Sequence, residues 1–473
     1  MEISLYFYLI TLLYSEFYFI LGIILNSVEL PKIVVPPPGP KAKEVLEKDK
    51  RYLMQSFVRW YPLVVESAEG CVLTDVDGNK YIDLNAGIAV NSVGHRNPKV
   101  IGAIKMQADK FIHYSLTDFY YDPAVELAEK LSEIAPGASD KSVFFCNSGA
   151  EAVEGAMKVA RGHFKGARSY IMSYIGAFHG RLFGSMTLTS SKIAQRRWFD
   201  PLLPGVEHVP YPYCYHCPFK QSFPECGYYC ADFIEKYYFK KFVPPDETSA
   251  FVFEPIQGEG GYIVPPPGYW SKIRELCDKY GILMISDEVQ SGMGRTGKWF
   301  AIEHWNTVPD LITVAKGIAA GMPLGAVIGK KEIMDLPRGS HASTFGGNPV
   351  SCAAASAVID VIREDKLLEN VSTVGAYTIK RFKEMQEKHE LIGDVRGKGL
   401  MIGIELVKDK YTKEPAVKEL SKVLNESFKR GVAVIGCGKS TIRIAPPLSI
   451  SMELMDKAIS IIDDVLTHVE KDS

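Results

Sequence analysis

The chain carries almost no net charge and few cysteines. Its 54 Lys and Arg residues offset 56 Asp and Glu residues to a net charge of −2, so the composition indicates no nucleic-acid-binding surface. Nine cysteines in 473 residues are too few for a secreted scaffold held together by disulfides. The remaining composition, 47% hydrophobic and 23% charged, is that of a large globular protein and excludes a disordered or multi-span membrane chain.

Long hydrophobic runs are scarce too, with one exception at the N-terminus. Residues 3–25 are almost wholly apolar, and the run is long enough to cross a bilayer. It lacks the basic flank and the small-residue cleavage site of a signal peptide, and Glu16 interrupts it. Two interpretations of residues 1–26 stay open: upstream sequence translated from a wrong start site, which we favour, and a membrane or interfacial anchor. We expect the protein itself to be cytoplasmic.

Between about Gly87 and Gly346, short apolar runs alternate with segments of helical periodicity. Continuous runs of Val, Ile and Phe are typical of parallel strands that are buried on both faces. The alternation therefore predicts an α/β fold whose larger domain, residues 91–345, has a mainly parallel sheet between helices. The candidate strands are 142–146, 170–173, 250–254, 283–286, 311–314 and 324–328.

The two ends of the chain have a different pattern. Asp77-Gly78 separates two short apolar runs, 71–75 and 80–84, which favours a β-hairpin. Two further strands are expected at 400–406 and near 441–444, before an amphipathic helix from Met452. We predict that residues 27–90 and 346–473 together form one smaller α+β domain.

Several short motifs carry residues suited to chemistry, and each also has a purely structural explanation. Asn147-Ser148-Gly149-Ala150 follows a predicted strand and opens a helix, so its N–H groups could bind a phosphate. Ser148 could equally be an ordinary N-cap. The turn contains neither GxxxxGK[ST] nor GxGxxG, which argues against a nucleotide ligand.

A second motif, Phe178-His179-Gly180-Arg181, also follows a predicted strand. Phe178 could stack on a planar ring or belong to the core. Arg181 could hold a carboxylate or be a solvated surface residue.

Asp287 and Lys316 end two further strands. An acid at this end of a parallel strand can pair with a protonated pyridine nitrogen, although Asp287 could also cap a helix. A lysine that ends an apolar strand becomes nucleophilic if it is desolvated, but not if it reaches solvent. In this order, a phosphate turn, a stacking aromatic, an aspartate and a lysine are what pyridoxal 5′-phosphate requires.

The chain resembles the class III (ω-) aminotransferases, fold-type I pyridoxal-phosphate enzymes, and among them most closely the 4-aminobutyrate aminotransferases. The resemblance runs from about Val58 to the C-terminus and rests on SGAEA, FHGR, EPIQGEGG, DEVQ, AKG and STFGGNP, in family order. It implies that Lys316 binds the cofactor covalently and moves the substrate proton, while Asp287 pairs with the pyridine nitrogen and Gln290 reaches the phenolic oxygen. The implied cofactor-binding set is Ser148, Gly149, Ala150, Phe178, His179, Asp287, Gln290, Lys316 and, from the partner subunit of a homodimer, Thr344.

The same resemblance implies a set of substrate residues. Glu259 would neutralise Arg443 when no α-carboxylate is bound, Arg181 would receive a distal carboxylate, and Ile88 would form an apolar wall above the cofactor. A fixed structural ion pair between Glu259 and Arg443 is the alternative.

The implied reaction is transamination, from an amino acid or ω-amine such as 4-aminobutyrate or ornithine to a 2-oxo acid, with 2-oxoglutarate as the expected acceptor. Amino-acid racemisation or epimerisation with the same cofactor on the same scaffold is the nearer alternative. A non-catalytic binding protein that keeps the fold is the more distant one.

Four cysteines depart from the family pattern. The segment that contains them is rich in aromatic residues and proline and resembles an inserted loop; its cysteines are Cys214, Cys217, Cys226 and Cys230. A metal site, disulfides and free thiols all stay open for them. Since none of the four fits a catalytic role, we assign no metal to the active site.

Overall fold

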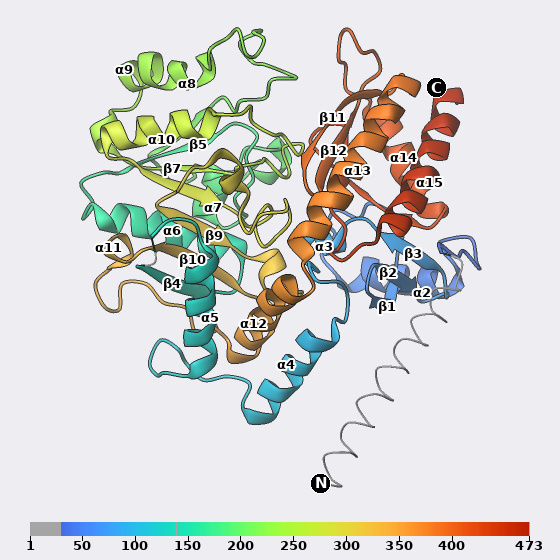
Figure 1. Cartoon of the computed structure of the whole chain (residues 1–473), viewed down its shortest axis with the longest axis horizontal. Helices are drawn as coiled ribbons and strands as arrows, with labels where there is room; N and C mark the ends of the chain where they lie inside the picture. The colour runs from blue at the N-terminus through green and yellow to red at the C-terminus, as the bar shows by residue number, and fades with distance from the viewer. Residues whose placement is uncertain (1–29, 139, 473) are drawn as a thin grey trace.

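A seven-stranded sheet forms the centre of the larger part of the protein (Figure 1). The computed structural model describes residues 30–138 and 140–472, so the apolar segment 1–26 lies outside the described residues. The strand order across the sheet is β4 (Lys141–Cys146), β10 (Gly325–Lys330), β9 (Leu311–Val314), β8 (Leu283–Asp287), β7 (Thr248–Phe253), β5 (Tyr170–Tyr174) and β6 (Val206–Val209).

Only one of these strands runs against the others. β10 is antiparallel to both β4 and β9, whereas the pairs formed by β9, β8, β7, β5 and β6 are all parallel. The mainly parallel sheet expected from the sequence is therefore confirmed. Because β10 is reversed, its first residues lie at the same edge as the last residues of the parallel strands.

Helices cover both faces of this sheet, which explains the continuous apolar runs. On β8, Leu283 and Ile285 pack into the cluster formed with α6 (Gly149–His163), while Met284 packs into the cluster that includes α10 (Tyr269–Tyr280). Apolar side chains of β8 are thus buried on both faces of the sheet, as is typical of parallel sheets.

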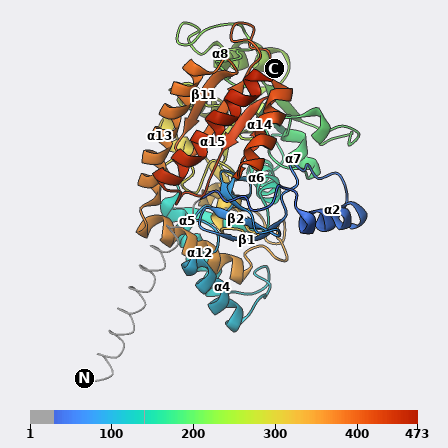
Figure 2. The same ribbon diagram turned by 90° about the vertical axis from the view of Figure 1, so that its right-hand side faces the viewer.

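The chain ends build a smaller α+β part, as the sequence predicts. β13 (Val432–Ala433) pairs in parallel with β3 (Lys80–Asp83), joining the C-terminal segment to the N-terminal hairpin formed with β2 (Val72–Asp75). A second four-stranded sheet has the order β11 (Ile392–Lys398), β12 (Met401–Leu406), β15 (Thr441–Ile444) and β14 (Ile435–Cys437). Figure 2 shows α13 (Leu367–Lys388) and α15 (Met452–Lys471) lying over it. This part also contains β1 (Val65–Glu69) and α14 (Val417–Lys429).

The remaining helices connect or flank these sheets. The domain boundaries at residues 90 and 345 stay a prediction. Among these helices, α12 (Pro349–Glu364) packs against α4 (Pro98–Lys110) and α5 (Asp122–Ile134). In the described part of the chain, no helix is long and apolar enough to cross a membrane. The other helices are α2 (Pro40–Tyr52), α3 (Ala86–Ala89), α4 (Pro98–Lys110), α5 (Asp122–Ile134), α7 (Phe183–Leu188), α8 (Tyr229–Phe233), α9 (Phe239–Lys241), α11 (Lys331–Met334), α12 (Pro349–Glu364) and the short helices η1 (Ile193–Gln195), η2 (Ile234–Tyr238), η3 (Pro245–Glu247), η4 (Ala301–Trp305) and η5 (Lys316–Ile318).

Candidate active site

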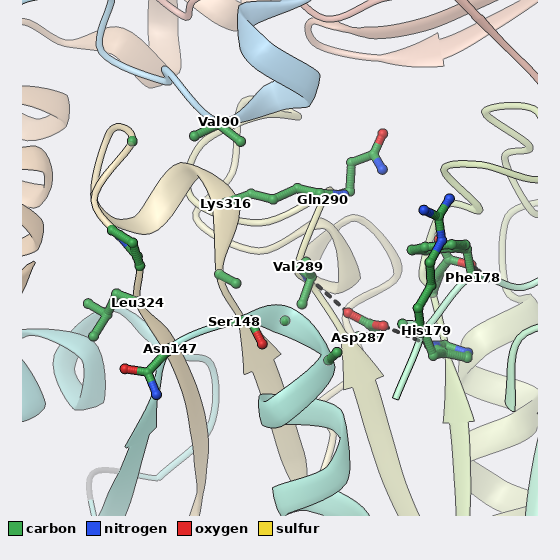
Figure 3. A pocket seen from close by; sticks show the side chains of 18 of the residues that line it. Val90, Asn147, Ser148, Phe178, His179, Asp287, Val289, Gln290, Lys316 and Leu324 are labelled. Carbon is green, nitrogen blue, oxygen red and sulfur yellow. Dashed lines mark hydrogen bonds and ion pairs between the residues drawn. The ribbon is translucent and has the colours of Figure 1, made fainter. Parts of the chain in front are cut away.

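A cavity of about 400 Å³ opens where β4, β5, β8 and β9 end. Segments far apart in the sequence meet there because parallel strands end at one edge of the sheet. Figure 3 shows Lys316 extending over this cavity toward Gln290, with Asp287 and His179 deeper inside. Of the residues predicted from the sequence, the cavity is lined by Ser148, Gly149, Ala150, Phe178, His179, Arg181, Asp287, Gln290 and Lys316.

The start of α6 forms the turn that the sequence predicts as an anion site, here called the anion turn (residues 147–150). Ser148 does cap the helix, since its Oγ accepts a hydrogen bond of 3.2 Å from the Glu151 N–H. The N–H groups of Gly149 and Ala150 belong to the first helical turn, which has no intrahelical acceptors for them. A Cβ atom at Gly149 would lie 2.8 Å from Cγ1 of Val289, so only glycine lets this turn approach the cavity so closely.

Asp287 is fixed at the end of β8 by three hydrogen bonds. Its Oδ1 accepts from the Val289 N–H at 3.0 Å and from the Thr313 hydroxyl at 3.1 Å, and its Oδ2 lies 2.6 Å from Nδ1 of His179. Burial acts to lower the pKa of His179, but the hydrogen bond and charge of Asp287, with the charge of Glu254, outweigh burial and raise it. The imidazole therefore holds the Asp287 carboxylate in a fixed orientation.

Lys316 has the properties of a nucleophilic amine. Burial and, to a smaller extent, the nearby charge of Arg443 outweigh the opposing charges of Asp287, Glu254 and Glu259 and lower the pKa of its side chain to about 8. Its backbone has a φ of 45°, in the left-handed region that L-residues rarely adopt. A strained residue of this kind at a cavity is typical of a functional position.

Glu254 is a cavity residue that sequence reasoning did not select, although it opens the EPIQGEGG motif. Its buried carboxylate accepts hydrogen bonds from the N–H groups of Phe178 at 3.0 Å and Gly258 at 2.9 Å. Burial raises its pKa to about 7. Glu254 thus anchors the segment that carries Phe178. The exposed Arg181 also lies near Phe178, with its guanidinium carbon 5.6 Å from the ring centroid.

Arg443 and Glu259 do lie together, beside the cavity, but Glu259 has a second partner. Arg443 Nη2 lies 3.4 Å from Glu259 Oε2, and its Nη1 lies 3.3 Å from Oε1 of Gln290. Lys192 Nζ lies closer to Glu259, at 2.6 Å from Oε1. No sequence signal singled out Lys192, because 67 residues separate it from Glu259. Arg443 Nε is buried without a hydrogen-bond partner in the described part of the chain, which leaves a donor for a ligand.

Besides Glu259 and Arg443, two further predicted residues, Ile88 and Thr344, do not line the cavity. Ile88 is 45% exposed, and Val90, two positions later, lines the cavity instead. Thr344 is exposed on the surface, and its neighbour Ser343 accepts a hydrogen bond of 3.0 Å from the Asn147 side chain beside the anion turn. Contribution of Thr344 from a partner subunit therefore stays a prediction.

The four loop cysteines line a second, very small cavity of about 20 Å³. All nine cysteines of the chain are free thiols in this structure. Among residues 30–138 and 140–472, no group of three or more His, Cys, Asp or Glu side chains is arranged to hold a metal ion. Burial raises the pKa of Cys230 to about 12, which keeps that thiol protonated.

Comparisons with known proteins identify the family to which the chain is similar. Residues 54–466 match the family described as aminotransferase class-III. The alanine/serine racemase of Pyrococcus horikoshii is 42% identical over 95% of this chain and 95% of its own length. The isoleucine 2-epimerase of Lentilactobacillus buchneri is 45% identical over 91% of this chain and 96% of its own length.

Aminotransferases match over similar lengths. The 4-aminobutyrate aminotransferase of Mycobacterium leprae is 38% identical over 93% of this chain and 99% of its own length, which confirms the resemblance seen in the motifs. A crystal structure of an (S)-enantioselective ω-transaminase from Thermomicrobium roseum has a TM-score of 0.85 and 33% identity, covering 90% of this chain and 99% of that one.

Proposed function

Because the chain belongs to the class-III aminotransferase family of pyridoxal-phosphate-dependent enzymes, we propose that it transfers the amino group of an amino acid or ω-amine to 2-oxoglutarate. The expected donors are 4-aminobutyrate and ornithine. The observation that carries the proposal is the buried Arg443 next to Glu259, a carboxylate that also has Lys192 as a partner. Such an arrangement suits a site that binds substrates both with and without an α-carboxylate.

The residues of the cavity fit pyridoxal phosphate. The N–H groups of Gly149 and Ala150 would bind the phosphate. Asp287 would pair with the protonated pyridine nitrogen, and Lys316 would bind the cofactor covalently at its carbonyl carbon. When bound, the cofactor supplies an electron-poor ring that stabilises negative charge at the substrate carbon. Phe178, Val289 and Gln290 would lie around that ring.

Lys316 would move the proton at the reacting carbon. Its pKa of about 8 leaves part of the amine unprotonated near neutral pH, so Nζ can accept a proton from the substrate and return it elsewhere. Its side chain extends over the cavity, where a substrate bound near Arg181 would meet it (Figure 3).

The carboxylates of substrates would be held by two arginines. Arg181 lines the outer part of the cavity and would bind a distal carboxylate. Arg443 would bind an α-carboxylate through its unpaired Nε. With an ω-amine, Arg443 would instead stay neutralised by Glu259, which avoids an unpaired buried charge.

Racemisation is a second candidate. The alanine/serine racemase and the isoleucine 2-epimerase are 42% and 45% identical to this chain, compared with 38% for the 4-aminobutyrate aminotransferase of Mycobacterium leprae. That reaction needs proton donors on both faces of the substrate carbon. Lys316 serves one face. A second group would have to serve the other face, and Glu259, the carboxylate beside Arg443, is engaged by Lys192 and Arg443, which makes it a poor proton donor.

One pair of assays separates the two reactions. Amino donors are first incubated with 2-oxoglutarate, and glutamate formation is measured; the proposal expects it with 4-aminobutyrate or ornithine. Single enantiomers of alanine, serine, leucine and methionine are then incubated without any oxo acid. Rapid loss of optical activity, together with no glutamate in the first assay, would replace transamination by racemisation.

The proposal includes a cytoplasmic homodimer. Thr344 and its neighbour Phe345 are exposed, Phe345 by 60%, close to the anion turn, as expected for a segment that enters a partner subunit's site. Light scattering gives the mass of the assembly, and subcellular fractionation gives the compartment. A monomer with full activity would contradict the shared site.

A further inference from the structure

The backbone that follows Glu259 lies directly on the small C-terminal sheet. A Cβ atom at Gly403 of β12 would lie 3.0 Å from Cβ of Tyr262 and 3.2 Å from the Gly261 carbonyl oxygen. The N–H of Gly438 donates a hydrogen bond of 2.8 Å to the Glu259 carbonyl. The glycine at 403 therefore lets the loop approach this sheet closely, and the small sheet decides where the Glu259 side chain starts.

Arg396 of β11 is the main connection between that loop and the sheet. Its Nη2 donates to the Gly261 carbonyl at 2.6 Å, and its Nε donates to the Tyr262 carbonyl at 3.1 Å. The remaining donors reach Asp394 and Glu405, both at 2.7 Å, and the Thr441 hydroxyl at 3.5 Å. A guanidinium has its N–H groups in a fixed planar fork, and each of the three nitrogens of Arg396 donates at least one hydrogen bond here.

Charged groups behind Arg396 hold it in this orientation. Glu405 accepts hydrogen bonds from His216 at 2.7 Å and from the Tyr213 hydroxyl, and it forms an ion pair with Arg396. Burial acts to raise the pKa of Glu405, but these donors outweigh it and lower the pKa to about 2. Tyr213 and His216 belong to the cysteine-bearing loop, so this loop supports the network from the large-sheet side. Glu405 is therefore ionised at all working pH values.

We propose that Arg396 is a positioning residue for substrate selection: by holding the carbonyls of Gly261 and Tyr262, it keeps the Glu259 carboxylate within reach of Arg443. This inference rests on the proposed function, because it gives Glu259 the task of neutralising Arg443 when an ω-amine binds. Arg443 lies on β15, which pairs with β12 of the small sheet. Arg396, on β11 of the same sheet, holds the loop that carries Glu259, so Arg443 and Glu259 are both positioned by this sheet.

The consequence differs between the two half-reactions. With an ω-amine, Arg443 needs Glu259 nearby, so a displaced loop leaves a buried cation unpaired and impairs the reaction. With an α-amino acid, the substrate carboxylate itself pairs with Arg443, and the exact place of Glu259 matters little. Loss of Arg396 is therefore expected to change the preference between donors and not to reduce all reactions equally.

The test uses the full-length enzyme carrying its cofactor, with Arg396→Gln/Glu405→Gln as the main variant. Both buried charges are removed together, so neither is left unpaired. Arg396→Lys is the conservative variant. The control is Arg381→Gln, which removes an ion pair with Asp456 between α13 and α15, far along the chain from the Glu259 loop.

The first readout is the rate of each half-reaction, followed by cofactor absorbance with 4-aminobutyrate and with L-glutamate separately. In the double variant we expect kcat/KM for 4-aminobutyrate to fall about 10-fold or more, and that for L-glutamate by less than about 3-fold. Arg396→Lys is expected to fall between the double variant and wild type, because an ammonium cannot reach both carbonyls. Equal losses with both donors would overturn the inference.

The second readout does not depend on activity. Amide hydrogen exchange is measured by mass spectrometry for the peptide that contains residues 257–263, in which Gln257 and Ile263 bond to each other's carbonyls at 3.1 Å. We expect exchange there to accelerate about 10-fold in the double variant and to stay unchanged in Arg381→Gln. Unchanged exchange in the double variant would also overturn the inference.

Failure of the proposed function gives a different result. If the wild-type enzyme transfers no amino group from any ω-amine, the function is wrong, and a role of Arg396 in donor selection falls with it. Hydrogen exchange would then still report whether Arg396 holds the loop.

Discussion

Lys192 Nζ lies 2.6 Å from Oε1 of Glu259, an ion pair that joins the segment after α7 to the loop after β7. In the proposed reaction, Glu259 would therefore keep a cationic partner when Arg443 binds a substrate carboxylate. Glu259 would not become an unpaired charge in either half-reaction, which would lower the free-energy cost of switching between substrates.

Replacement of Glu259 by alanine should therefore affect the two half-reactions unequally. We expect Glu259→Ala to impair the reaction with 4-aminobutyrate more than that with L-glutamate, since only the former leaves Arg443 unpaired. Stopped-flow measurements with each donor alone give both rate constants. A larger loss with L-glutamate would argue against the exchange of partners at Arg443.

Lys316→Ala should abolish the visible absorbance of the lysine-bound cofactor and lower turnover by about three orders of magnitude or more. The reason is that the variant loses both the covalent attachment point and the group that moves the substrate proton. Lys380→Ala, which removes an exposed surface lysine on α13, is the control. An unchanged visible spectrum in Lys316→Ala would show that another lysine carries the cofactor.

Asp287→Asn should retain cofactor but remove the α-proton slowly, because a neutral amide cannot stabilise a protonated pyridine nitrogen. His179→Phe, which removes the hydrogen bond to Asp287 Oδ2, should have a smaller effect of about 10- to 100-fold. Deuterium exchange at the substrate α-carbon measures this step directly. Near-normal exchange in Asp287→Asn would count against its assigned role.

The pH dependence of cofactor uptake should report the lowered pKa of Lys316. The neutral amine is the reactive form, and its fraction rises with pH through the pKa of about 8. Uptake of pyridoxal phosphate by the cofactor-free protein should therefore accelerate between about pH 7 and pH 9 and level off above that range. A midpoint near the ordinary lysine value, 10.5, would mean that the amine is solvated.

The order of the main strands and most residues that line the cavity could be predicted from local sequence. Strands such as β8 are buried on both faces, so their apolar runs are continuous and easy to recognise. Other strands were missed because they lack such a run: β13 has only two residues, and in β6 Glu207 and His208 separate the two valines. Asp287 and Lys316 could be selected because each lies at the end of an apolar run, which is visible without knowledge of the rest of the fold.

The partners of the substrate residues were decided only by the tertiary structure. The sequence determined that Ser148, Asp287 and Lys316 would gather, because parallel strands end at a common edge. It could not show that Lys192 reaches Glu259, because that contact joins two connecting segments of the large part that are far apart in the sequence. It also could not show that Arg396 binds the Gly261 carbonyl, because that contact depends on how the small sheet packs against the large part. Local sequence sets which strands and helices form, whereas long-range packing sets which charges meet.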